Sequence, residues 1–181
     1  MTSTLLAPLR LPAQGIAVAT RLEHVLRAGA LLRQGSVVVL DDSVVVTGRK
    51  ALGVVLLACG AGCSEQLISE HVAAAIAMGN RVVLTFVEAP TGDIAALVAV
   101  LQRCISRAWF QVVASPGEAW HIRPEDALSV AVLTPSSLTV DDHRLQHVLD
   151  PDMEPDLHAM FRRFSASTAV TVPVTVTRWR P

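Results

Sequence analysis

An adjacent acidic pair, Asp41 and Asp42, is the strongest candidate for chemistry in this sequence. The pair directly follows the apolar run Val37–Leu40, which predicts a strand covered on both faces. Open α/β proteins place ligand-binding groups at such strand ends, where carboxylates can move protons or hold a divalent cation. The alternative is a simple turn, because aspartate side chains accept hydrogen bonds from nearby backbone N–H groups. The pair alone does not decide between these interpretations.

A second acidic pair, Asp141 and Asp142, is followed closely by His143 and His147. If this segment is helical, the four-residue spacing puts both histidines on one face, where imidazoles can bind a metal ion. Either aspartate would supply a third ligand. No clear partner elsewhere in the sequence completes the set, so the metal assignment stays open.

Two further groups of polar residues point to structure more than to chemistry. Cys59 and Cys63 have a spacing of C-x₃-C, and no second Cys or His pair is placed to complete a zinc site, so small-residue packing at a strand end is the prediction. Glu65, Glu70 and His71 lie on one predicted helix and diverge around it, which predicts a solvated helix face. No glycine-rich segment matches a P-loop or a dinucleotide fingerprint.

The elements that must position these residues alternate between helices and strands, which predicts a single α/β domain with a mixed sheet; an α+β arrangement is the alternative. Residues 1–19 are interpreted as an N-terminal arm and residues 20–181 as the domain, within which 43–52 is a loop and 135–149 a turn with a short helix. Pro173 lacks an N–H and predicts an edge strand. The predicted helices are 20–35, 64–78, 94–105 and 156–164, and the predicted strands are 37–40, 53–58, 81–87, 109–114, 128–133 and 167–177.

The composition narrows the class of protein. The chain has 181 residues, of which 51% are hydrophobic and 17% are charged, with a net charge of −1. This balance argues against nucleic-acid binding through phosphate neutralisation, and the lack of a long apolar run argues against membrane insertion. Three cysteines suit a reducing cytoplasm, so we expect a cytoplasmic protein. The high apolar fraction favours a buried dimer face.

Several short segments occur together in an order that is typical of one enzyme family. They are Leu32–Gly35, Val37–Asp42, Cys63–Ile68, Met78–Val83, Leu128–Val132, Leu138–His143, Asp150–Leu157 and Val172–Val174. This order resembles 3,4-dihydroxy-2-butanone 4-phosphate synthase, the enzyme of riboflavin biosynthesis that acts on ribulose 5-phosphate. The resemblance spans about residues 20 to 176, and it rests on the order of the segments more than on any one match.

This sequence differs from that family at the residues that bind the metal ion and carry out the reaction. In the family, an acidic loop follows the Asp-Asp pair and holds a divalent metal ion and the sugar phosphate. Here Ser43–Lys50 stands in its place and has no carboxylate. The family's active-site cysteine falls near Leu84, and its later arginine falls on His143, which leaves Asp142 as a match. The reaction needs a metal ion and placed carboxylates, so we expect the fold to be kept and the reaction lost.

Three functional hypotheses follow from these observations. The first is a divergent synthase-like homodimer that binds a small phosphorylated ligand or a partner enzyme and needs no cofactor, with Mg²⁺ only if the ancestral site is partly retained. The second is an enzyme with altered chemistry on a small phosphorylated or carbonyl substrate, with Asp41, Asp42, Asp142 and His143 as catalytic groups. The third is an NAD-cleaving or caspase-like effector, because residues 64–70 are similar to a segment of Toll/interleukin-1-receptor domains and residues 56–59 resemble the Cys motif of caspase-like domains.

Overall fold

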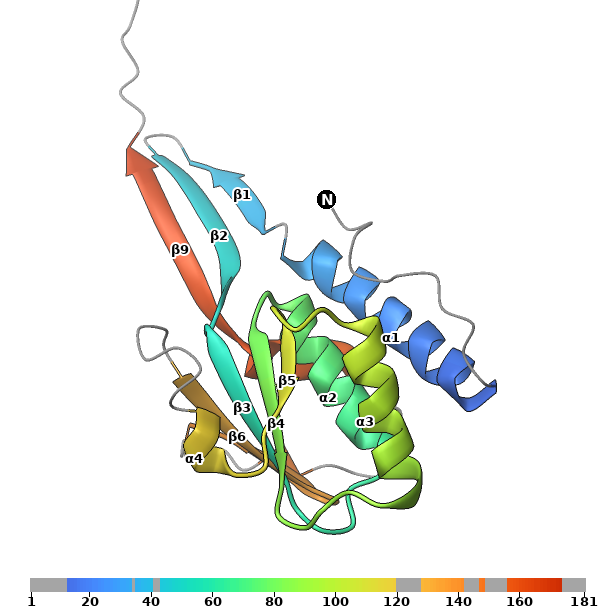
Figure 1. Ribbon diagram of the computed structural model, residues 1–181. Helices are drawn as coiled ribbons and strands as arrows, with labels where there is room; N and C mark the ends of the chain where they lie inside the picture. The colour runs from blue at the N-terminus through green and yellow to red at the C-terminus, as the bar shows by residue number, and fades with distance from the viewer. Residues whose placement is uncertain are drawn as a thin grey trace, which may run out of the picture.

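A computed structural model describes residues 13–33, 35–40, 43–119, 128–141, 147–148 and 156–173. Helices pack on mixed parallel and antiparallel sheets, so the predicted α/β class is confirmed (Figure 1). The helices are α1 (Ala13–Leu32), α2 (Glu65–Ala77), α3 (Gly92–Cys104), α4 (Pro116–Ala119) and α5 (Leu157–Arg163). The strands are β1 (Ser36–Val39), β2 (Ser43–Ala51), β3 (Val54–Cys59), β4 (Arg81–Phe86), β5 (Phe110–Val112), β6 (Leu128–Thr134), β7 (Ser137–Val140), β8 (His147–Val148) and β9 (Ser165–Pro173).

The larger sheet has six strands in the order β5-β4-β3-β6-β7-β8. The four strands from β5 to β6 are parallel, and β7 and β8 continue the sheet in antiparallel fashion. The continuous apolar runs of β3 and β4 are buried, as their sequences predicted, because helices cover one face and α4 contacts β3 on the other (Figure 1). The main hydrophobic core lies between this sheet and helices α1, α2 and α3.

A separate three-stranded antiparallel sheet, in the order β1-β2-β9, projects from this body (Figure 1). Its middle strand occupies residues 43–51, so the predicted loop at 43–52 was wrong. All nine residues of β2 pair with β9, more than a hundred residues away in the chain, and that partner is what extends the segment. The edge position predicted for the strand containing Pro173 is confirmed.

Helix α1 begins at Ala13, seven residues before the predicted cap at Thr20. It packs closely against α2, and a Cβ added to Gly29 would overlap the Cβ of Ala77. This contact explains a glycine in the last turn of α1, because glycine within a helix otherwise lowers its stability. Within the described part of the chain, no helix is long and apolar enough to cross a membrane.

The segment predicted as a turn and short helix at 135–149 is built differently. Residues 137–140 form strand β7, which returns antiparallel to β6 through a turn at Pro135 and Ser136. His147 begins strand β8, which pairs with β7. The helical spacing proposed for the histidine pair therefore does not apply to His147. The prediction failed because residues 137–140 are held extended by their pairing with β6.

Candidate functional site

The four residues proposed as catalytic, Asp41, Asp42, Asp142 and His143, lie outside the described residues. The described residues next to them are Leu40 and Ser43 in the first case and Asp141 in the second. The N–H of Leu40 donates to the carbonyl oxygen of Ser43 at 2.8 Å, which joins β1 to β2 next to the first pair.

The strand that precedes the first acidic pair is not the buried parallel strand that its sequence predicted. All four residues of β1 are exposed, and the strand pairs only with β2, in antiparallel fashion. The expected carboxyl end of a parallel sheet is therefore missing at this point. About 30 Å of extended chain, the length of β2, separates Ser43 from the start of the central strand β3.

Asp141, the first residue of the second acidic pair, has a structural role. Asp141 has a positive φ of 53°, and its Oδ1 accepts a hydrogen bond of 2.6 Å from the N–H of Val130. Its own N–H donates to the Val130 carbonyl oxygen at 2.7 Å. The side chain thus closes the end of the β6–β7 hairpin, as aspartate does in turns.

The small sheet has two unlike faces, because opposed residues in an antiparallel pair project to the same side. One face carries hydroxyl groups, and the Oγ of Ser36 lies 2.6 Å from the Oγ1 of Thr47. Neither face of β2 carries a carboxylate. We call the other face the valine face, and it consists of Val37, Val39, Val44, Val46, Val170 and Val172.

A cleft of about 140 Å³ lies at the carboxyl ends of β3 and β4. Its lining includes the turn from Cys59 to Cys63 and residues 88–91, which lead into α3. The first turns of α2 and α3 adjoin the cleft. The Oγ of Ser64 accepts a hydrogen bond from the N–H of Leu67 at 3.1 Å and so caps α2, as its sequence predicted. The sheet order reverses beside β3, and α/β proteins bind ligands at such points.

The two thiols in this cleft are poor nucleophiles. Burial, together with the nearby Cys63, raises the pKa of Cys59 to about 12. Burial also raises the pKa of Cys63, whose Sγ donates to the Leu133 carbonyl oxygen at 3.4 Å. Because the thiolate is the reactive form, neither group is activated. Among the described residues, no group of three or more His, Cys, Asp or Glu side chains is placed to hold a metal ion.

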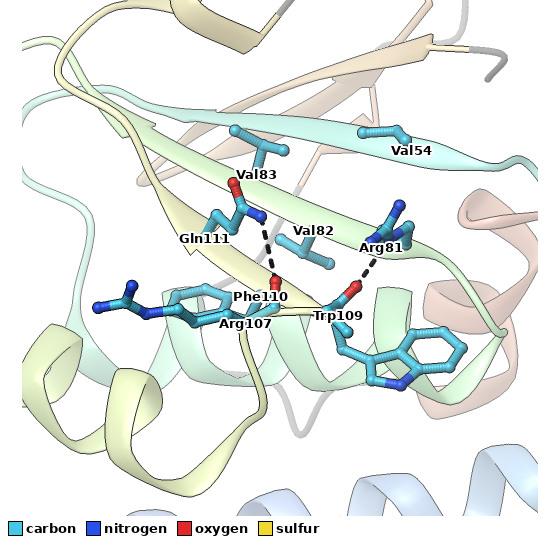
Figure 2. Close-up of a pocket in the computed structure, with 9 residues that line it drawn as sticks. Val54, Arg81, Val82, Val83, Arg107, Trp109, Phe110 and Gln111 are labelled. Carbon is cyan, nitrogen blue, oxygen red and sulfur yellow. Dashed lines mark hydrogen bonds between the residues drawn. The ribbon is translucent and has the colours of Figure 1, made fainter. Parts of the chain in front are cut away.

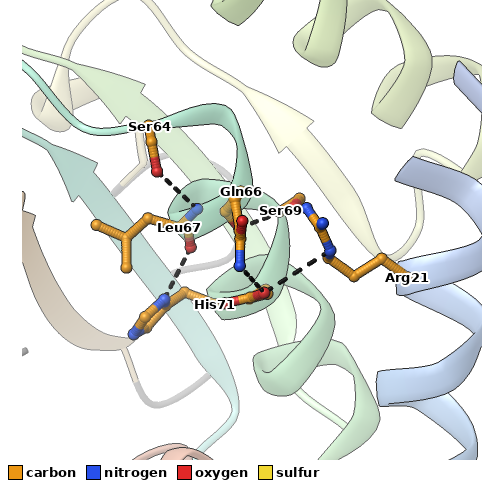
Figure 3. A network of polar contacts seen from close by, with 7 residues as sticks. Arg21, Ser64, Gln66, Leu67, Ser69 and His71 are labelled. Carbon is orange, nitrogen blue, oxygen red and sulfur yellow. Dashed lines mark hydrogen bonds and ion pairs between the residues drawn. The ribbon is translucent and has the colours of Figure 1, made fainter. Parts of the chain in front are cut away.

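The predicted solvated face of α2 was wrong for Glu70 and His71, which are both buried. Glu70 Oε1 accepts a hydrogen bond of 3.0 Å from Gln66 Nε2 and lies 3.7 Å from Nε of Arg21 on α1 (Figure 3). Burial raises the pKa of Glu70, while Gln66 and Arg21 act in the opposite direction. This network attaches α1 to α2, and an amphipathic reading of α2 missed it because helices cover α2 on more than one side.

His71 lies on the other side of α2, against the ring of Phe164. Its Nδ1 is 2.8 Å from the Leu67 carbonyl oxygen, and its buried Nε2 has no partner among the described residues. Burial lowers the pKa of His71 to about 4. The imidazole is therefore neutral near pH 7 and is part of the packing between α2 and α5.

A second hollow lies at the amino ends of β4 and β5 (Figure 2). The Nε of Arg81 donates to the Ala108 carbonyl oxygen at 2.7 Å, and Nε2 of Gln111 donates to the Arg107 carbonyl oxygen at 3.1 Å. With a volume of about 10 Å³ it admits no more than a water molecule. The guanidinium of Arg81 donates to backbone, and the space is too small for a ligand, so this hollow is a structural feature.

No family model and no curated protein matches this chain. Similar solved structures include proline utilization A from Bradyrhizobium japonicum, with a TM-score of 0.45 and 20% identity over 58% of this chain and 11% of that one. Succinate-semialdehyde dehydrogenase from Burkholderia pseudomallei has a TM-score of 0.46 and 19% identity, over 57% of this chain and 22% of that one. The chain spans less than a quarter of either protein. The resemblance to the butanone phosphate synthase stays a prediction.

Proposed function

We propose that this protein is a non-catalytic binding and scaffold homodimer of the cytoplasm. On the sequence resemblance, it is a divergent relative of 3,4-dihydroxy-2-butanone 4-phosphate synthase that has lost the reaction on ribulose 5-phosphate. One observation carries the proposal. The segment Ser43–Ala51, which would have to supply the acidic metal-binding loop, is a strand with β1 on one side and β9 on the other.

This strand is unsuited to the lost chemistry for two reasons. Divalent cations such as Mg²⁺ bind oxygen ligands, above all carboxylates, and β2 has none. All nine of its residues pair with β9, and Val44–Thr47 also pair with β1, so the backbone groups in these ladders are not available to a sugar phosphate. A reaction that removes protons beside carbonyl groups needs both a Lewis acid and a base, and β2 supplies neither.

The cleft at the carboxyl ends of β3 and β4 is the place where we expect a small phosphorylated ligand to bind. Backbone N–H groups at helix N-termini favour anions, and two such termini adjoin the cleft. The buried, protonated thiols there favour binding over nucleophilic chemistry. In this proposal the ligand binds in the cleft of the larger sheet, away from the small sheet of β1, β2 and β9.

The two enzymatic alternatives have less support. Chemistry by Asp41 and Asp42 in this cleft would require them to reach it from the far end of β2. An NAD-cleaving effector would need an accessible glutamate on α2, whereas Glu70 is buried against Arg21. A caspase-like mechanism would need a thiolate, and burial keeps Cys59 protonated.

The proposal is tested by incubating the purified protein with ribulose 5-phosphate and Mg²⁺ and following formate by proton NMR. We expect no formate above that of a protein-free control over many hours. An active synthase assayed in the same buffer shows that the substrate and the metal ion are competent. Formate that accumulates in proportion to the concentration of this protein contradicts the loss of the reaction.

A further inference from the structure

We infer that Cys59 and Cys63 together bind a soft monovalent metal ion, Cu(I), at the carboxyl end of β3. Both thiols line the cleft of about 140 Å³, and the short turn Gly60–Gly62 joins them. The inference goes beyond the proposed function, because it depends neither on the resemblance to the synthase nor on a phosphorylated ligand.

The turn between the two cysteines brings their side chains together. The carbonyl oxygen of Leu133 on β6 accepts from the N–H of Gly60, at 2.8 Å, and from the thiol of Cys63, at 3.4 Å. The sulfur of Cys63 and the first backbone nitrogen after Cys59 therefore contact the same atom. The nearby Cys63 also raises the pKa of Cys59, as expected for two sulfur atoms at short range. A pair of neighbouring thiols thus faces one cleft.

The number of thiols decides which metal ion fits. Structural Zn²⁺ sites take four ligands, and the described residues hold no group of three or more His, Cys, Asp or Glu side chains placed for a metal ion. Cu(I) is soft, prefers thiolates, and forms stable complexes with two of them. The third cysteine, Cys104, ends α3, about 15 Å along the helix from Ile94 at the cleft, so it is not a ligand.

The surroundings of the thiols suit a two-coordinate complex. Both cysteines are buried, and the side chains of Ile68, Phe86 and Ile94 line the same cleft. These apolar groups offer no further ligand and limit the access of water to the metal ion. Site walls of this kind control solvent access to a bound metal.

The negative charge of the complex also has partners, because two thiolates and one Cu⁺ carry a net charge of −1. Helix α2 is capped by Ser64, the residue after Cys63, so the positive end of its dipole lies beside this ligand. A hydrogen bond from the backbone of Gly60 lowers the pKa of Cys63, against the larger opposing effect of burial. Both features stabilise the thiolate that a metal ion needs.

Binding replaces two S–H bonds with two S–Cu bonds. Each thiol releases its proton to the solvent, and no electron is transferred, because copper enters and remains as Cu(I). Protonation of the free thiols lowers the affinity without preventing binding, since a coordinating thiol loses its proton to the metal ion's charge. The thiols are therefore poor nucleophiles and still competent ligands.

The test is an anaerobic titration of the reduced, full-length protein with the Cu(I) complex of the coloured chelator bicinchoninate. The wild type should remove one equivalent of Cu(I) from the chelator. Cys59→Ser and Cys63→Ser should each raise the dissociation constant for Cu(I) about 100-fold or more, because even an outer-shell change costs about 10–100-fold. Cys104→Ser removes a buried thiol outside the cleft and is the matched control, with a change within about twofold.

Two further measurements guard against misfolding of the variants. Circular dichroism checks the fold of each variant, and Cys59→Ala replaces Cys59→Ser where a buried hydroxyl disturbs it. X-ray absorption at the copper edge of the loaded wild type should show two sulfur neighbours.

Three results overturn the inference. They are a wild type that leaves copper with the chelator, variants of Cys59 and Cys63 that keep the wild-type affinity, and a Cys104→Ser variant that binds as weakly as they do. None of these results bears on formate production, so failure of this inference and failure of the proposed loss of the reaction are distinguishable.

Discussion

Asn80 makes the contacts from which the sharpest stability prediction follows. The residue is fully buried just after α2, and its side chain makes four hydrogen bonds to backbone groups. Oδ1 accepts from the N–H groups of Leu52 and Gly53, at 2.6 and 3.1 Å. Nδ2 donates to the carbonyl oxygens of Ala75 and Phe164, at 2.9 and 2.7 Å. One amide thus joins the β2–β3 junction, the end of α2 and the start of β9.

Replacing Asn80 with Ala leaves four buried backbone groups without that partner. Each buried group left unsatisfied costs about 1–3 kcal/mol, and partial relaxation or entering water recovers part of the loss. We expect the free energy of unfolding to fall by about 4 kcal/mol, which is a large share of the stability of a small domain. Asn80→Asp keeps the oxygen that accepts from Leu52 and Gly53 but loses the amino group that donates to Ala75 and Phe164, so it should also destabilise the protein strongly.

Urea denaturation followed by circular dichroism measures this loss. Gln102→Ala is the matched control, because it removes an exposed amide and should change the free energy of unfolding by less than about 0.5 kcal/mol. If Asn80→Ala costs less than about 1 kcal/mol with an unchanged denaturant slope, the four bonds do not hold these segments together. The reasoning that ties the small sheet to the body through Asn80 would then be refuted.

The sequence predicted the parallel part of the fold well because its signals are local. The apolar runs of β3 and β4 and the Ser64 cap each depend on a few neighbouring residues, and each lies where it was predicted. Strand β2 was missed because its extended form depends on pairing with β9, far away in the chain. The same distant pairing creates the valine face, which is invisible until the register is known.

The candidate site was harder to predict than the fold. The run Val37–Leu40 suggested a strand buried on both faces, but burial depends on the neighbours of a strand, and β1 projects from the body with the small sheet. The prediction for Glu70 and His71 failed for the converse reason, since charged residues on a helix are usually solvated. Here Arg21 and Phe164, both distant in sequence, provide the environment that buries them.

Two further predictions concern the packing of α2. Gly29→Ala should lower the free energy of unfolding by about 1–3 kcal/mol, because the added Cβ overlaps Ala77. Gly117→Ala, on the exposed α4, is the control and should be near neutral. Equal effects of the two changes on the urea midpoint would contradict the close contact between α1 and α2. The pKa of His71 is about 4 in the folded protein and near 6.5 in the unfolded chain. Between pH 6.5 and pH 4 the unfolded chain therefore binds more protons than the folded protein. The free energy of unfolding falls as the pH is lowered through this range. The loss should reach roughly 3 kcal/mol near pH 4. Glu70, whose pKa is raised, contributes the opposite slope in the acid range, so the comparison is made in a Glu70→Gln background. There, His71→Gln should abolish the decline below pH 6.5, and an unchanged decline would show that another group is responsible.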